Sequence, residues 1–522
     1  GSGSDRVSGA RSLPLPTLNS QMSLWTEITN TALIGCERKS PSLDFPSGKL
    51  GVALGRLDRN DREGALLAAA ALVSLYERAG TLPLKDAQPA LEACKPDNAP
   101  RCGERAAIHL AMMLRGEFRR LLPEWLAKAA AAGRRAPEEL LPSLLELGRA
   151  RETPPDEILP ALGARGRWLA AQNPDWFYAV EKLDETLWEV GSGAQRREAL
   201  AELRKRDAAR ARELLASSWE RESPKDRADF LAALEKGLSL DDEAFLEAAL
   251  DDRRKEVRSA AVDLLARLPE SALRRRMFER VRPLLTFKLS RLKRKTIEIA
   301  LPEACDKEMQ RDGVEPKPYS RDIGEKAWLL QQMLGMIPPE VWSRESGWPI
   351  SELIEAAKRS DWKSVLLNGW SQAAWLCRDM EWAAALLVEN HEHGQDEYLF
   401  QVLSQARQEA FILELLRKDP SLHTSNPARN YVAICWRQWG EALSRAVINS
   451  LLRHAATDRF KDSWMWSGFI DNIGCRLNPA LIPEAISRLT EATKPPAERA
   501  PALERFLDFI QFRHEMLKEI SQ

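Results

Sequence analysis

The chain lacks the long apolar runs that mark membrane-spanning helices, because no stretch approaches the roughly 18 to 20 residues needed to cross a bilayer. Its N-terminus also lacks the basic-then-apolar order of a secretion signal. Basic and acidic side chains balance at 76 against 77, so bulk charge selects neither a polyanion nor a polycation as partner. These absences predict a cytoplasmic chain without a membrane partner, in which any electrostatic function is local.

Cysteine is sparse and catalytic signatures are missing. The seven cysteines include no Cys-x-x-Cys pair, which favours reduced structural thiols over a disulfide framework or a zinc site; they are Cys36, Cys94, Cys102, Cys305, Cys377, Cys435 and Cys475. The sequence contains no GxxxxGK(S/T), no HExxH, no GxSxG and no GxGxxG after a strand. We therefore expect no catalytic residue, no cofactor and no metal site.

One short segment could in principle bind a metal. His391 and His393 flank Glu392 in "NHEHGQDE". A His-x-His spacing suits a strand or a loop, and no further cluster of ligands accompanies it. A polar loop between helices is the favoured interpretation.

What the sequence does contain is a repeat of 31 residues, because Arg258 has counterparts at Arg227, Arg196 and Arg165. The positions four and seven residues later are apolar except for Gln172: Leu169, Leu200, Leu231 and Val262, then Leu203, Leu234 and Leu265. Such spacing lies on one helix face. A second helix recurs at the same period, marked by Leu215, Leu246 and Met277 and by Trp219, Leu250 and Val281. Each period therefore holds two helices.

Helix starts are signalled independently by residues that cap helices. Ser223-Pro224-Lys225-Asp226 and Ser239-Leu240-Asp241-Asp242 have the form Ser-x-x-Asp, and Thr153-Pro154-Pro155-Asp156 is similar. A lone helix pair cannot bury its apolar face, so a fixed period between about 20 and 50 residues indicates stacked units. The sequence predicts an all-α fold, an α-solenoid of stacked helix pairs.

The stretch "DDRRKEVRSAAVDLLARLP" (251–269) resembles a HEAT-type unit of the short bacterial kind, with an acidic turn, Val-Arg, small residues and Leu-Leu. The resemblance is good over 195–285. We expect residues 1–21 to be a disordered tag and linker before a native start at Met22, followed by an N-terminal helical region (22–150), HEAT-like repeats (151–310) and a C-terminal helical region (311–522). The last boundary lies in the polar segment "RDGVEPKPYSRD" (311–322).

Three blocks together resemble an uncharacterised bacterial family of helical-repeat proteins: "TALIGCERKSP" (31–41), "LGARGRWLAAQNPDW" (162–176) and residues 207–269. The resemblance covers most of residues 22–480. Members of that family tend to be encoded beside MoxR-type AAA+ ATPases and von Willebrand factor A proteins. The resemblance thus implies an adaptor or scaffold role by association, and it supplies no catalytic residue.

The strongest local anomaly is a basic strip with ten basic residues against one acid, Glu279: Arg274, Arg275, Arg276, Arg280, Arg282, Lys288, Arg291, Lys293, Arg294 and Lys295. If the strip is helical, Leu273, Met277 and Val281 form one buried stripe and Leu289, Leu292 and Ile299 another. Arg276, Arg280, Lys288, Arg291 and Lys295 then point outward.

Three interpretations of the basic strip stay open. It is a solvated face neutralised by neighbouring acids, a surface for an acidic protein partner, or a surface for nucleic acid. The neighbouring acids lie within one repeat, at Glu235, Asp241, Asp242, Glu243, Glu247, Asp251, Asp252 and Glu256.

Tryptophan is abundant, and 11 of the 17 tryptophans lie between Trp328 and Trp466. Large aromatics can serve as stacking platforms or interface anchors, but most of these are expected in the core. A DNA glycosylase would need a carboxylate beside exposed tryptophans. Asp175-Trp176 and Asp361-Trp362 are the adjacent pairs, and both are explained more simply as helix starts.

The leading hypothesis from sequence is a non-catalytic protein-binding scaffold or adaptor, with a MoxR-type AAA+ ATPase or von Willebrand A protein as partner. The alternative is a nucleic-acid-binding HEAT-like protein, of the DNA repair or DNA glycosylase type, that uses residues 274–295.

Overall fold

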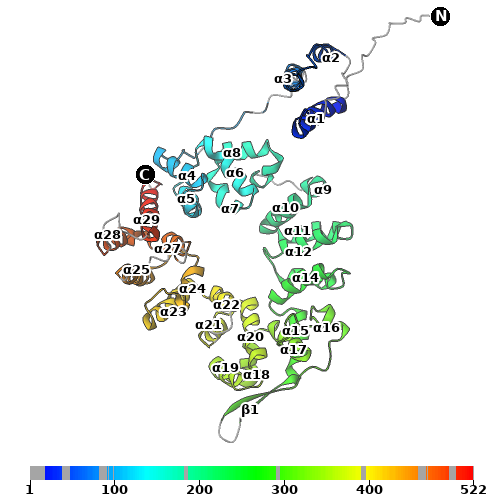
Figure 1. Ribbon diagram of the computed structural model, residues 1–522. Coiled ribbons are helices and arrows are strands. Elements are labelled where there is room, and N and C mark those ends of the chain that lie inside the picture. Colours follow the sequence, from blue (N-terminus) through cyan, green and yellow to red (C-terminus); the bar gives the residue numbers. More distant parts are fainter. Residues whose placement is uncertain are drawn as a thin grey trace, which may run out of the picture. The chain divides into compact units, whose positions relative to one another are not determined.

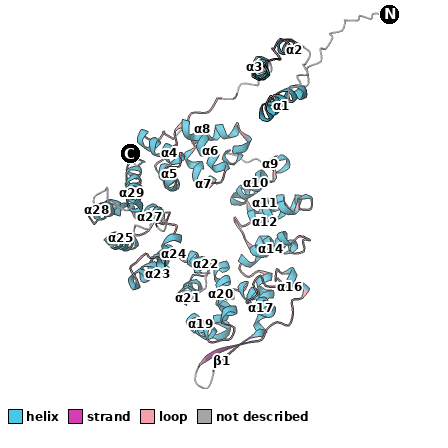
Figure 2. Ribbon diagram, in the orientation of Figure 1, coloured by secondary structure: helices cyan, strands magenta, loops and turns pink. Residues whose placement is uncertain are grey.

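The computed structural model describes residues 18–37, 48–80, 91, 93–97, 99–180, 186–289, 294–389, 396–456, 466, 468–492 and 501–520. Regular structure in these residues is helical apart from one two-stranded hairpin, as Figures 1 and 2 show. One isolated bridge joins Arg101 and Arg135. The all-α prediction is confirmed. Contacts divide the chain into two compact units, residues 1–93 and 94–522. The boundaries expected near 150 and 311 both fall inside the second unit.

The first unit contains three described helices around a small core of its own. Leu24 and Ile28 of the first helix pack with Leu50, Leu54, Leu66, Ala69 and Val73 of the other two. The first helix begins inside the segment that was expected to be a tag and linker, and residues 1–17 lie outside the described residues. The helices are α1 (Leu18–Ile34), α2 (Lys49–Leu54) and α3 (Arg62–Gly80).

The second unit begins with short helices, several of which start with proline in the first turn, where its missing N–H costs nothing. They are α4 (Glu104–Leu114), α5 (Leu122–Ala131), α6 (Leu141–Arg149), α7 (Pro155–Ile158) and α8 (Gly163–Ala171). Short 3-10 turns connect them: η1 (Arg119–Leu121), η2 (Glu138–Leu140), η3 (Leu159–Ala161) and η4 (Pro174–Ala179).

The repeat region consists of stacked helix pairs. Its elements are α9 (Thr186–Val190), α10 (Gly193–Arg206), α11 (Ala208–Ser218), η5 (Trp219–Arg221), α12 (Pro224–Ala233), η6 (Leu240–Asp242), α13 (Glu243–Ala249), α14 (Lys255–Arg267) and α15 (Ala272–Val281). Helix α12 packs against both α10 and α14, so each unit covers the next. Leu200, Leu231 and Val262 are buried, as are Leu215, Leu246 and Met277. Buried side chains therefore recur along the stack with the predicted period of 31 residues.

Two of the three predicted caps form. The Ser223 hydroxyl accepts from the Asp226 N–H at 3.2 Å, and Ser239 and Asp242 form a reciprocal capping box. The prediction for Thr153 was wrong, because α7 begins at Pro155 and its cap position, Pro154, has no side chain that can accept a hydrogen bond. The second proline shifts the helix start by one residue, and Thr153 is buried instead.

Two of the repeat arginines, Arg196 and Arg227, link one helix pair to the next. The Arg196 guanidinium lies 4.5 Å from the Trp188 ring centroid and donates to Glu222 at 2.8 Å. One repeat later, Arg227 lies 5.7 Å from the Trp219 ring and 3.3 Å from an Asp252 carboxylate oxygen. Arg196 and Arg227 thus each bridge an aromatic ring and an acid of the following turn, and their side chains serve the stack.

The remaining elements are a hairpin and the tryptophan-rich helices. They are η7 (Arg282–Leu284), β1 (Leu285–Leu289), β2 (Lys295–Ile299), α16 (Lys307–Arg311), α17 (Glu325–Gly335), α18 (Glu340–Ser346), α19 (Ile350–Lys358), α20 (Lys363–Cys377), α21 (Met380–Glu389), α22 (Asp396–Val402), α23 (Gln405–Lys418), α24 (Pro427–Ile434), α25 (Glu441–Ala456), α27 (Phe469–Arg476), η9 (Pro479–Leu481), α28 (Ile482–Glu491) and α29 (Pro501–Ile520).

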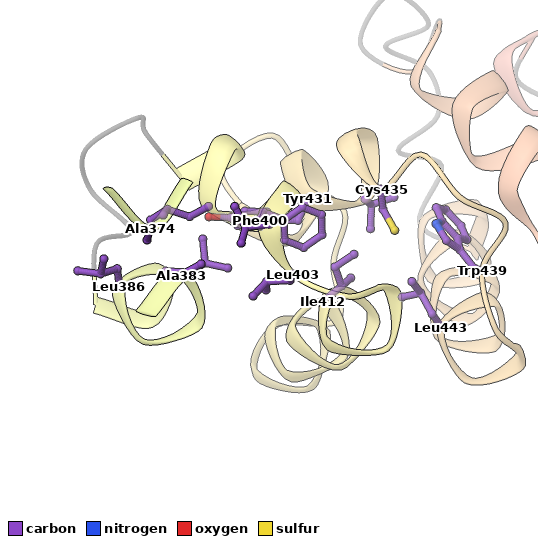
Figure 3. Close-up of a cluster of buried hydrophobic side chains, with 14 of the residues drawn as sticks. Ala374, Ala383, Leu386, Phe400, Leu403, Ile412, Tyr431, Cys435, Trp439 and Leu443 are labelled. Atoms are coloured by element: carbon purple, nitrogen blue, oxygen red, sulfur yellow. The ribbon is translucent and has the colours of Figure 1, made fainter. Parts of the chain in front are cut away.

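Tryptophans of this region mostly fill the core, as expected. Trp342, Trp370, Trp382 and Trp439 are buried, whereas Trp436 is 68% exposed. Figure 3 shows one apolar seam running from Ala374 of α20 through Phe400 and Tyr431 to Leu443 of α25. The helices beyond residue 322 therefore continue the stack.

The stack of the second unit closes on itself, because its last helix packs against its first ones. Helix α29 contacts α27 and α28 on one side and α4 and α5 on the other (Figure 1). The Arg513 guanidinium is fully buried there and forms two 2.7 Å hydrogen bonds with the Glu124 carboxylate. Its third nitrogen donates to the carbonyls of Gly474 and Leu477. The ring of Phe118 stacks on Phe512 with centroids 4.2 Å apart.

Helices long and apolar enough to cross a membrane are absent from the part of the chain that the structure describes.

Candidate partner-binding surface

The basic strip lies on two different elements. Residues 272–281 form helix α15, whose first turn is capped by the buried Ser271 hydroxyl, and Leu273, Met277 and Val281 are buried as predicted. Residues 285–289 and 295–299 pair as antiparallel strands and do not form the predicted helix. The alternation in "LTFKL" and "KTIEI" places every second side chain on one face, and this period of two overrides the helical spacing assumed for Leu289 and Ile299. Leu292 lies outside the described residues.

Arg274 lies in the interior. Its Nε donates to the Ala266 carbonyl at 2.8 Å, and its Nη2 lies 3.2 Å from the Cys377 sulfur. Burial lowers the pKa of Arg274 and raises the pKa of the Cys377 thiol. Arg274 therefore holds the end of α14 beside the end of α20, and its guanidinium is engaged by these contacts.

Arg276 and Arg280 converge on one buried carboxylate, Asp312. Arg276 donates to Asp312 at 2.9 and 2.7 Å and to Glu247 at 3.0 Å, and Arg280 donates to Asp312 at 2.6 Å. Burial acts to lower the pKa of Arg276, but the hydrogen bonds to the two acids raise it overall. Asp312 belongs to the segment 311–322, in which the boundary before the C-terminal helical region was expected. Its carboxylate pairs with both of these α15 arginines.

The cations near the hairpin also have acidic partners. Arg282 pairs with Glu345 at 3.0 Å and Lys288 with Glu298 at 2.6 Å. Lys295 pairs with Glu352 and lies 5.2 Å from the Trp348 ring centroid. Arg294 is exposed, whereas Arg291 and Lys293 lie outside the described residues. Arg275 is exposed and forms no ion pair with any residue that the structure describes.

A groove of about 870 Å³ runs along the exposed side of α15. It is lined by Pro269, Glu270, Arg274, Arg275, Phe278, Ile337, Pro338, Glu340, Val341, Arg344, Glu345, Cys377 and Asp379. Apolar side chains from α15 and the α17–α18 turn meet exposed charges of both signs. Arg344, for example, pairs with Glu340 at 3.1 Å with both side chains largely in solvent.

A smaller pocket of about 310 Å³ adjoins this groove and shares Phe278 and Glu345 with it. Its other lining residues are Glu279, Arg282, Pro283, Leu285, Phe287 and Trp342. The two hollows thus extend from the end of α20 to the base of the hairpin. Apolar lining surrounded by mixed charge is the composition of protein interfaces, and it differs from the continuous positive surface that phosphates require.

Sequence reasoning identified only one side of this surface. Glu340, Val341 and Arg344 on α18, and Asp379 at the start of α21, were not among the predicted residues. They reach the groove because α15 packs against α17, which in turn packs against α20. No local pattern signals such contacts, since each residue alone resembles an ordinary surface position.

The other sequence candidates do not form a site. Asp175 lies in a capped turn, where its N–H donates to Asn173 at 3.0 Å. His391 and His393 lie outside the described residues. Within the described ranges, no group of three or more His, Cys, Asp or Glu side chains could hold a metal ion.

Fold and surface together define an all-helical repeat protein with a mixed-charge groove. The chain belongs to a protein family of unknown function, DUF5691, whose model matches residues 27–520. Comparison with curated proteins and with solved structures gave no significant match.

Proposed function

We propose that this protein is a non-catalytic scaffold or adaptor that binds another protein through the groove along α15. The observation that carries the proposal is the lining of that groove, where Phe278, Pro338 and Val341 lie among exposed charges of both signs. Apolar centres ringed by charged side chains give protein interfaces their affinity and their specificity.

We further propose that the partner belongs to a MoxR-type AAA+ ATPase and von Willebrand A system in the cytoplasm. The support is the resemblance of residues 31–41, 162–176 and 207–269 to helical-repeat proteins encoded beside such genes. Membership of the family of unknown function assigns no activity by itself.

Nucleic acid is the competing partner, and the ion pairs weigh against it. Nucleic acids bind through lysine and arginine side chains that contact the phosphates and release the counterions held there. Arg276, Arg280 and Arg282 already face carboxylates of this chain, so a phosphate would have to displace Asp312 or Glu345 first.

The proposal is tested by direct binding of the full chain to the purified MoxR-type ATPase and von Willebrand A protein of the same genome. We expect one of them to bind, and Arg275→Glu to weaken binding by about tenfold because the side chain lines the groove. Arg505→Glu is the matched control, since Arg505 is also exposed but lies on α29.

Failure of both candidates to bind would contradict the AAA+ proposal. If the Arg275→Glu variant binds as tightly as the wild-type protein, the groove is not the binding surface. A parallel titration with duplex DNA separates the alternative class. Affinity that appears at about 50 mM salt and falls roughly a thousandfold by about 200 mM would favour nucleic acid.

A further inference from the structure

The β1–β2 hairpin has one apolar and one polar face. Phe287 lies 5.5 Å from the Trp348 ring and 6.4 Å from the Trp342 ring, measured between centroids. Leu285 and Ile297 are buried on the same face. On the opposite face, Thr286, Lys288 and Glu298 are exposed. The tryptophans therefore fix the orientation of the ribbon.

The outer edge of β1 carries backbone groups that no strand satisfies in the described part of the chain. The Ala300 N–H donates to the Leu284 carbonyl at 2.9 Å, so Leu284 and Ala300 form a hydrogen-bonded pair. In an antiparallel ladder such pairs recur at every second residue, so the N–H and C=O groups of Thr286 and Lys288 face β2. The N–H and C=O groups of Phe287 and Leu289 consequently point away from β2.

The edge of β2 differs, because this strand lies beside α19. Strand β2 contacts α19, and Lys295 pairs with Glu352 of that helix. The 310 Å³ pocket, by contrast, is lined by Leu285 and Phe287 of β1. An added strand places alternate side chains level with those of its neighbour, so a strand beside β1 would direct an apolar side chain toward this pocket.

The described residues of the hairpin carry more positive than negative charge, with Lys288, Arg294 and Lys295 against the single acid Glu298. The Lys288–Glu298 pair is more than half exposed on both sides, so a competing carboxylate can replace it at little cost. A second copy of the hairpin would bring like charges together, whereas an acidic segment would be attracted.

We propose that the β1 edge accepts an extended acidic segment of the partner protein as a third strand, with one apolar side chain of that segment entering the pocket beside Phe287. Main-chain hydrogen bonds to Phe287 and Leu289 would supply affinity, and the pocket and charges would supply selectivity. The inference rests on the proposed function, because it names the chemistry of the protein partner.

The first experiment uses labelled peptides of about ten residues and the full chain. One peptide alternates valine with glutamate, one replaces glutamate by lysine, and one has the acidic composition rearranged to the helical period. We expect the alternating acidic peptide to bind at least about tenfold more tightly than the other two. Equal affinities, or no binding of the acidic peptide at about 1 mM, would overturn the inference.

The second experiment separates strand addition from mere charge attraction. Leu289→Pro deletes an N–H that points away from β2, so the ladder of the hairpin survives while the outer edge loses a donor. Leu289→Ala keeps that donor and is the control for the lost side chain, which is 62% exposed. We expect the proline variant to bind the acidic peptide about tenfold more weakly than the alanine variant. Equal affinities of the two variants would contradict strand addition.

Hydrogen exchange distinguishes strand addition from charge attraction, because only main-chain hydrogen bonds would protect individual amides of the edge. On peptide binding, the amides of Phe287 and Leu289 should exchange more slowly, whereas the exchange rate of the Lys288 amide should not change because it already faces β2.

If the intact partner binds the proline variant as it binds the wild-type protein, the hairpin inference fails while the adaptor proposal stands. If no partner binds the wild-type protein but the acidic peptide does, the adaptor assignment fails and the hairpin site stands.

Discussion

Asp242 shows how a charge is held inside the helix stack. Its buried carboxylate accepts from Arg204 at 2.9 and 2.8 Å, from Arg212 at 2.8 Å and from the Ser239 N–H at 3.0 Å. Burial acts to raise the pKa of Asp242, but the hydrogen bonds from the two guanidinium groups lower it below its ordinary value of 3.8. Removing the negative charge leaves the buried Arg204 and the partly buried Arg212 without a full partner.

We predict that Asp242→Asn lowers the free energy of unfolding by about 3 to 5 kcal/mol at neutral pH. Because the folded pKa is depressed, the stabilisation by Asp242 is complete above the unfolded pKa of 3.8 and is lost as pH falls through the folded value. Urea denaturation across a pH series should therefore show the gap between the two proteins narrowing in acid.

The neighbouring Asp241 supplies the control, because it belongs to the same turn and is exposed. Asp241→Asn should change the free energy of unfolding by less than about 0.5 kcal/mol. A gap that stays constant down to the acid limit would show that the Asp242 charge does not contribute to folding.

Among the elements, α14 is the one that the repeat predicted most completely. Leu265 is fully buried between neighbouring helices, so Leu265→Asp places a carboxylate without a partner in the seam. We predict a loss of several kcal/mol in the free energy of unfolding, measured by denaturant titration. Arg254→Ala, at the exposed start of the same helix, should cost less than about 0.5 kcal/mol. Equal effects of the two changes would mean that the α14 seam does not stabilise the stack.

The helices and the hairpin differ in how clearly nearby residues in the sequence predict them. Helices α10 to α15 follow from apolar spacing, and the caps at Ser223 and Ser239 follow from short-range side-chain chemistry. The hairpin was missed because a dense run of basic residues conceals the alternation of Leu285, Phe287 and Leu289. That alternation was a usable signal, since a period of two cannot be presented by a helix.

The candidate surface was predicted only in part, and the reason is again physical. Burial and pairing depend on which helices meet, as Arg274 and Arg276 show. Both belong to one run of arginines, yet Arg274 ends against the Ala266 carbonyl and Arg276 against Asp312, 36 residues further along the chain. A charge count cannot separate them. Among the described arginines of α15, Arg275 is the exposed one, and it forms no ion pair with any described residue.

At the scale of the whole second unit, closure follows from contacts between segments almost 400 residues apart. Arg513 and Glu124 are separated by 389 positions, so no repeat or cap could indicate their pairing. Closing so long a chain segment costs conformational entropy that grows only slowly with length. The buried guanidinium, its two carbonyl acceptors and the Phe118–Phe512 stack can therefore offset that cost locally.

Arg513 should consequently control closure and leave the repeats intact. We predict that Arg513→Ala speeds amide exchange in α4, α5 and α27, which α29 covers, while exchange in α12 and α14 stays at the wild-type rate. Hydrogen exchange with mass spectrometry measures both regions in one sample. Arg505→Ala, on an exposed face of the same helix, should reproduce the wild-type pattern. Faster exchange spread evenly over the unit would mean that closure and stacking are one cooperative event, because loss of the seam would then unfold the repeats as well.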